Sequence, residues 1–153
     1  MLRNVGKALR IISDDNKEKI AIIIDEPTVS QYFQLANLEK MKKALMQIGT
    51  IRIGKVITDK RLTEEESALI NAVGFQEEIV GSDVDIHVTL NLLNLLHSKS
   101  TDIIGVATTD PNLFPVFSRI KKEKKLLIIT YKNNITPAIE SIADYILELD
   151  YFV

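Results

Sequence analysis

Apolar residues occur along this chain in short blocks that are typical of buried strands. Continuous β-branched runs at 19–25, 103–107 and 126–130 fit strands that are covered on both faces. Apolar and polar positions alternate over 51–57, which favours a further strand. Two shorter strands are predicted at 75–80 and around 145–147.

The segments between these strands have helical spacing. Helices are predicted over 38–48, 63–74, 84–96 and 113–120, and from Thr136 onward. Thr63 and Glu66 form the signature of a capping box, and Pro137 suits the first turn of the last helix.

One segment fits two periods. Residues 84–90 alternate like a strand, but the apolar stretch runs for about 15 residues, a length that favours a helix. Ser82 with Asp85 three residues later also suits a helix start. The apolar surface of this helix is wide enough either to pack on two sides or to contact another subunit, which would make a homodimer.

The alternation of strands and helices predicts a doubly wound α/β domain with helices on both faces of a parallel sheet of about five to six strands. We expect this domain to span 19–153. Residues 1–18 are predicted to be an appended helix or arm.

Composition narrows the function classes. The 153 residues suit one domain, and the absence of cysteine excludes thiolate zinc sites, disulfides and cysteine nucleophiles. No run approaches the roughly 20 apolar residues of a membrane span, and the first residues lack a signal-peptide core, so a cytoplasmic protein is expected. A net charge of −2 argues against coating nucleic acid by electrostatics alone.

Three acids stand next to apolar segments. Asp25 and Asp110 end strand runs, so they are expected at the carboxyl edge of the sheet, and Asp85 opens the predicted 84–96 helix. Carboxylates gathered at one edge favour a hard cation such as Mg²⁺ or Mn²⁺. Local explanations remain open: Asp110 before Pro111 suits a helix cap, and Asp85 suits a capping box. Asp25 has no helix predicted directly after it to explain it as a cap.

Three segments carry a resemblance to a known family, namely 24–28 (IDEPT), 82–86 (SDVDI) and 108–113 (TTDPNL). In their order and spacing the chain resembles, from about Ile20 to Leu149, the NYN branch of the PIN-like nuclease superfamily, in particular its short archaeal members. The resemblance implies a three-layer α/β/α fold whose acids hold Mg²⁺ or Mn²⁺ and activate water to cleave an RNA phosphodiester.

Carried over by position, Asp25, Asp85 and Asp110 fall on acids of that family. Asn112 and Asn91 stand where the family has further acids. The resemblance therefore implies catalysis by the three aspartates, with Asn112 as an additional metal ligand at the rim. An amide offers a carbonyl oxygen to a metal but brings no charge and cannot act as a base.

Other residues have two interpretations each. Four lysines are predicted to track the RNA backbone around the acidic centre, or else to lie on a solvated helix face: Lys121, Lys122, Lys124 and Lys125. Tyr32 and Phe33 suit base stacking or a packed loop. His87 and His97 lie about 15 Å apart along one helix, too far to share a metal.

Three hypotheses follow from these observations. The first is a metal-dependent ribonuclease, and the second is a degenerate relative that binds RNA or a protein partner without cutting. The third is a nucleotide- or phosphate-binding α/β module, which is disfavoured because the chain has no Gly-x-Gly-x-x-Gly motif and no P-loop.

Overall fold

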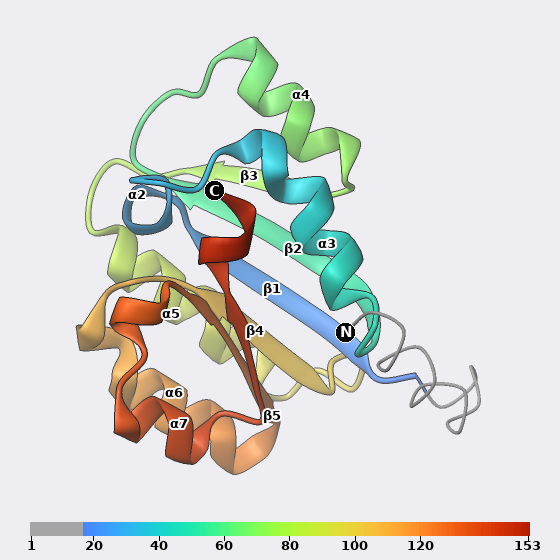
Figure 1. The fold of residues 1–153 in the computed structure, drawn as a ribbon, viewed down its shortest axis with the longest axis vertical. Helices are drawn as coiled ribbons and strands as arrows, with labels where there is room; N and C mark the ends of the chain where they lie inside the picture. Colours follow the sequence, from blue (N-terminus) through green and yellow to red (C-terminus); the bar gives the residue numbers. More distant parts are fainter. Residues whose placement is uncertain (1–16) are drawn as a thin grey trace.

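The computed structural model describes residues 17–153, so most of the helix or arm predicted for 1–18 lies outside the described residues. Six parallel strands form one sheet in the order β3-β2-β1-β4-β5-β6 (Figure 1). The strands are β1 (Lys19–Asp25), β2 (Thr50–Thr58), β3 (Gln76–Ile79), β4 (Ile103–Ala107), β5 (Lys125–Thr130) and β6 (Tyr145–Glu148). The predicted parallel sheet is confirmed.

Helices cover both faces of this sheet. They are α2 (Glu26–Val29), α3 (Leu38–Leu45), α4 (Glu64–Ala72), α5 (Val84–Leu95), α6 (Phe114–Glu123) and α7 (Pro137–Ile142). The helices α3 and α4 lie on one face, and α5, α6 and α7 lie on the other (Figure 1). The architecture is therefore the three-layer, Rossmann-like α/β/α arrangement. Within residues 17–153, no helix has the length and apolar character needed to cross a membrane.

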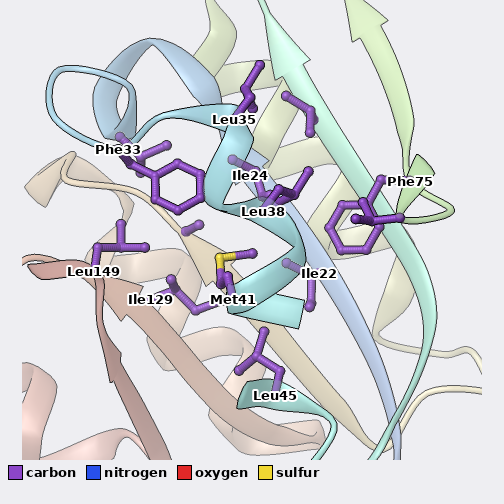
Figure 2. Packing of buried hydrophobic residues seen from close by; sticks show 14 of the residues in the cluster. Ile22, Ile24, Phe33, Leu35, Leu38, Met41, Leu45, Phe75, Ile129 and Leu149 are labelled. Carbon is purple, nitrogen blue, oxygen red and sulfur yellow. The ribbon is translucent and has the colours of Figure 1, made fainter. Parts of the chain in front are cut away.

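The core under α3 shows how β1 holds the centre of the molecule. Ile22 and Ile24 of β1 pack against Leu38 and Met41 of α3, and all four side chains are buried (Figure 2). Burial of an aliphatic side chain of this size contributes about 1.5–3 kcal/mol. Alternate residues of β1, such as Ile23, face the second core under α5, α6 and α7.

Of the two capping boxes predicted from the sequence, the structure has one and lacks the other. The Thr63 capping box is present: Glu66 N donates to Thr63 Oγ1 at 3.1 Å, and Thr63 N donates to Glu66 Oε1 at 3.0 Å. The predicted capping box between Ser82 and Asp85 is wrong. Asp83 occupies the cap position with a left-handed φ of 55°, and Ser82 Oγ donates to its carboxylate instead.

The 84–96 helix is confirmed as α5, but its outward side stays exposed. Val88 and Leu92 are buried against the sheet, whereas Ile86 and Leu90 are about half exposed at 54% and 53%. This outer row is not packed on a second side within the described chain. The homodimer expected from it stays a prediction.

Candidate functional site

The carboxyl ends of β1 and β4 meet at the point where the strand order reverses. The chain leaves the sheet edge at β3 and returns through α5 to form β4 on the other side of β1. Ile24 pairs with Ala107, so Asp25 and Thr108 follow as neighbours at the ends of these strands. In open α/β sheets, ligands bind in the crevice at such a switch point.

Asp25 is held in place by two threonines from different segments. Thr108 Oγ1 donates to Asp25 Oδ2 at 2.7 Å, and Thr28 Oγ1 donates to the same oxygen at 3.1 Å. The side chain is 2% exposed, and Oδ1 receives no hydrogen bond from the described part of the chain. Contrary to the sequence expectation, α2 begins directly after Asp25, but the Asp25 side chain makes no capping hydrogen bond to it.

The pKa of Asp25 is raised above its ordinary value of 3.8. Burial is the largest cause, because it disfavours the charged form, and the two threonine hydrogen bonds oppose it. The negative charges of Asp110 and Asp85 raise this pKa further. Two carboxylates from separate parts of the chain therefore act on Asp25 at this edge of the sheet.

Asp110 has both a capping and a site position. Its Oδ1 accepts from Asn112 N at 2.9 Å at the start of a 3₁₀ turn, which confirms the cap. Its own N–H donates to Thr108 Oγ1 at 3.0 Å, which ties it to the threonine that binds Asp25. Asp85 and Asn112 are exposed. Across residues 17–153, no three Asp, Glu, His or Cys side chains are grouped closely enough to hold a metal ion.

Glu26 lies on the other side of the β1 terminus. Its carboxylate is 2% exposed and accepts from Thr58 Oγ1 at 2.6 Å, and Lys60 Nζ lies 3.8 Å from Glu26 Oε2. Asp25 and Glu26 have partners on opposite sides of β1, because Thr108 after β4 binds Asp25 and Thr58 of β2 binds Glu26. Glu26 therefore belongs to the β2 end and does not add a ligand beside Asp25.

Asn91 is engaged within the fold. Lys55 Nζ donates to Asn91 Oδ1 at 2.8 Å, and Asn91 Nδ2 donates to His87 O at 2.8 Å. Lys55 also pairs with Glu78, and His87 Nδ1 lies 4.0 Å from the same glutamate. The ammonium group of Lys55 therefore lies against Asn91 Oδ1, and His87 is part of this cluster.

The predicted RNA-binding lysines lie at the opposite end of the sheet. They occupy the end of α6 and the start of β5, whereas the acids follow the ends of β1 and β4. At about 3.3 Å per residue, the length of β5 separates the two groups by roughly 17 Å. This arrangement does not place them as a rim around the acidic centre.

Three of these lysines also have partners within the chain, and Lys122 is exposed at the end of α6. The contacts are Lys121 Nζ to Asp144 Oδ1 at 2.6 Å, Lys125 Nζ to Glu18 Oε1 at 2.6 Å, and Lys124 Nζ to Ser98 O at 2.7 Å and Thr101 O at 2.6 Å.

Tyr32 and Phe33 differ from each other. Phe33 is 2% exposed and packs in the core under α3, so the packed-loop interpretation holds for it. Tyr32 is 69% exposed and meets the ring of Tyr131 edge-on at 5.6 Å. The hydroxyl of Tyr131 donates to Val29 O and accepts from Phe33 N at 2.7 Å, which fixes the loop after β1.

A cavity of about 410 Å³ adjoins the site over the ends of β4 and β5. Thr109 and Asp110 line one side, and Thr130, the last residue of β5, lies on its floor. Sequence reasoning did not single out Thr130. The available signal was a threonine at or just after the end of β2, β4 and β5, at Thr58, Thr108 and Thr130.

Comparison with known proteins supports the fold and leaves the activity to be argued from the site. No family model matches this chain. It is 25% identical over 134 residues to the uncharacterized protein MJ0482 of Methanocaldococcus jannaschii, covering 87% of this chain and 56% of that protein. The chain therefore spans about half the length of this curated relative.

A solved structure has the same architecture. The protein of unknown function VPA0982 from Vibrio parahaemolyticus matches with a TM-score of 0.73 at 19% identity, over 91% of this chain and 97% of that one. This likeness confirms the α/β fold class.

Proposed function

We propose that this chain is an NYN/PIN-like domain that hydrolyses RNA phosphodiesters with the help of Mg²⁺ or Mn²⁺ at the ends of β1 and β4. The observation that carries the proposal is the joint action of Asp110 and Asp85 on the buried Asp25. A carboxylate whose pKa is raised by burial and by neighbouring negative charges is unfavourable for the fold alone and is typical of functional sites.

The donor set fits a hard ion held in the way Mg²⁺ prefers. Mg²⁺ is commonly bound by one or two carboxylates, several waters and the substrate phosphate, rather than by a complete protein cage. Asp25 would offer Oδ1, and Asp110 would offer the oxygen that does not cap the 3₁₀ turn. Asp85, which is exposed, would act through water.

Each residue has a distinct role in this proposal. Thr28 and Thr108 fix the Asp25 carboxylate through Oδ2 and leave Oδ1 without a hydrogen bond from the described chain. A bound ion would neutralise phosphate charge and would lower the pKa of a bound water. Asn112 replaces a charge by an amide, which predicts slow cleavage.

Basic residues at the same edge would contact the RNA backbone. Lys60 and Arg61 follow β2, and Lys132 follows β5, and all three are exposed. Lys122 and its neighbours, at the far edge, would bind only a strand that extends around the molecule. A cytoplasmic location suits a chain without cysteine.

A second candidate is RNA binding without cleavage. It is favoured by the amides at Asn91 and Asn112, and by the absence of a three-carboxylate group among the described residues. In this case the crevice at Asp25 would remain a binding surface, and the raised pKa of Asp25 would have no catalytic use.

The test is cleavage of a labelled single-stranded RNA with Mn²⁺, with Mg²⁺ and with EDTA. We expect slow, metal-dependent cleavage that Asp25→Asn abolishes and Asn112→Asp increases. Asp59→Asn is the matched control, because Asp59 is an exposed carboxylate at the same edge on the β2 side. Cleavage that survives EDTA or Asp25→Asn contradicts the proposal, and RNA binding without cleavage selects the second candidate.

A further inference from the structure

The cavity beside the site is built from three kinds of wall. Its floor is the buried end of β5, and its sides are the first turns of α6 and α7 together with Thr109 and Asp110. The exposed lining residues Asn133, Asn134 and Ala138 form its mouth. Phe114, Phe117 and Ile139 give it flat apolar surfaces. No lysine or arginine lines it among the described residues, and Asp110 is its one acid.

Thr130 places an unused polar group on the floor. Ile128 and Thr130 share one face of β5 because alternate residues of a strand point the same way, and Ile128 belongs to the core under α6 and α7. Thr130 is 1% exposed, and its Oγ1 has no hydrogen-bond partner within the described chain. A buried hydroxyl without a partner is unfavourable, so a polar group that reached Thr130 Oγ1 through this cavity would be stabilised there.

We propose that this cavity binds a nucleobase of the RNA strand whose phosphate lies at Asp25 and Asp110. The inference rests on the proposed function and adds a subsite to it. The lining of the cavity has one carboxylate and no cationic side chain, which disfavours an anion. The phosphate would therefore stay outside, and the neutral base would enter.

Size and chemistry both suit a base. A cavity of about 410 Å³ lies in the range of small-ligand sites, which combine apolar walls with a few polar groups. Single-stranded RNA is read by splaying its bases onto aromatic side chains and hydrogen-bonding their edges. Phe114 supplies the aromatic ring, Thr130 the buried hydroxyl, and Asn133 and Asn134 the amides at the mouth.

The test uses free nucleosides with the full chain and no metal. Adenosine and uridine are titrated into ¹⁵N-labelled protein, and amide shifts are expected around 108–114 and 130–139. Thr130→Val should weaken binding about 5- to 10-fold, the value of one hydrogen bond. Thr101→Val is the matched control, because Thr101 is also buried with an unpartnered Oγ1 but lies before β4, at the other end of the sheet.

A second variant is needed in case Thr130→Val weakens nucleoside binding only by changing the fold. Ala138→Phe fills the mouth of the cavity from α7, where Ala138 is exposed, and should abolish the nucleoside shifts. Binding that Thr130→Val and Ala138→Phe weaken and Thr101→Val leaves unchanged supports the base subsite, even if no RNA is cleaved.

Three results would overturn the subsite. The first is the absence of amide shifts up to about 10 mM nucleoside, a concentration far above the Kd of a specific base site. The second is an equal effect of Thr130→Val and Thr101→Val on binding. The third is displacement of the nucleoside by inorganic phosphate. None of them affects the test of cleavage, which depends on metal and Asp25. The two proposals therefore fail separately.

Discussion

Replacing Thr108 by valine removes one hydroxyl from the site and keeps the shape of the side chain. This hydroxyl is buried, donates to Asp25 Oδ2 at 2.7 Å and accepts from Asp110 N at 3.0 Å. A hydrogen bond to a charged group contributes about 1.5–3 kcal/mol and a neutral one about 1 kcal/mol. We expect Thr108→Val to lower the free energy of unfolding by about 2–4 kcal/mol at neutral pH.

The loss should depend on pH through Asp25. Burial raises the pKa of Asp25, so the folded state binds more protons than the unfolded state above pH 3.8, and stability falls as pH rises through the folded pKa. The Thr108 hydrogen bond lowers this pKa, and its loss raises the pKa further. The destabilisation by Thr108→Val is therefore full where Asp25 is ionised and smaller where it is protonated.

Urea unfolding followed by circular dichroism measures this loss at about pH 3, which is below the ordinary pKa of an aspartate, and at about pH 7.5. For a chain of this size, the melting temperature should fall by roughly 4–16 °C at neutral pH. In an Asp25→Asn background the loss should shrink, because only a neutral hydrogen bond remains. An equal loss in both backgrounds, or at both pH values, refutes the claim that Thr108 serves the charge of Asp25.

Three further substitutions test the fold around the site. Asp25→Asn should stabilise the protein at neutral pH, with a gain that disappears below about pH 3.8, and chemical unfolding across pH checks it. Gly54→Ala should cost about 1–3 kcal/mol, because a Cβ there lies 2.3 Å from the Phe75 ring; Phe75→Leu in the same chain should recover part of the loss. Tyr131→Phe should cost about 1–3 kcal/mol by removing the hydroxyl that donates to Val29 O and accepts from Phe33 N, and faster proteolysis of the loop after β1 reports it.

The strands β1, β4 and β5 were predictable because buried parallel strands are continuous apolar runs, which leave few alternatives. The helix α2 was not, because four residues are too few for a helical period; Pro27 at its start was the remaining signal. The left-handed cap at Asp83 was also missed. An aspartate can adopt that conformation, but nothing in the sequence distinguishes such an aspartate from an ordinary exposed one.

The site was predictable in its acids and less so in its partners. Asp25 and Asp110 were expected at one edge from the ends of their strands. The hydrogen bond from Thr108 to Asp25 depends on strand register across 83 residues of sequence, which the apolar pattern of either strand does not specify. Lys121 and Lys125 were expected near the acids, yet a helix that connects parallel strands returns to the amino edge, and they lie there.

The central position of β1 affects how the protein folds as it is synthesised. Its neighbour β2 follows after about 25 residues, whereas the partner of Ile24 in β4 is Ala107, about 80 residues later. At about 5–20 residues per second, translation leaves the second edge of β1 without its partner for roughly 4–17 s. An apolar strand with an unpaired edge is prone to pair with other chains. Chaperones, or a lower temperature during expression, would slow the aggregation of nascent chains. Either should therefore raise the yield of folded protein.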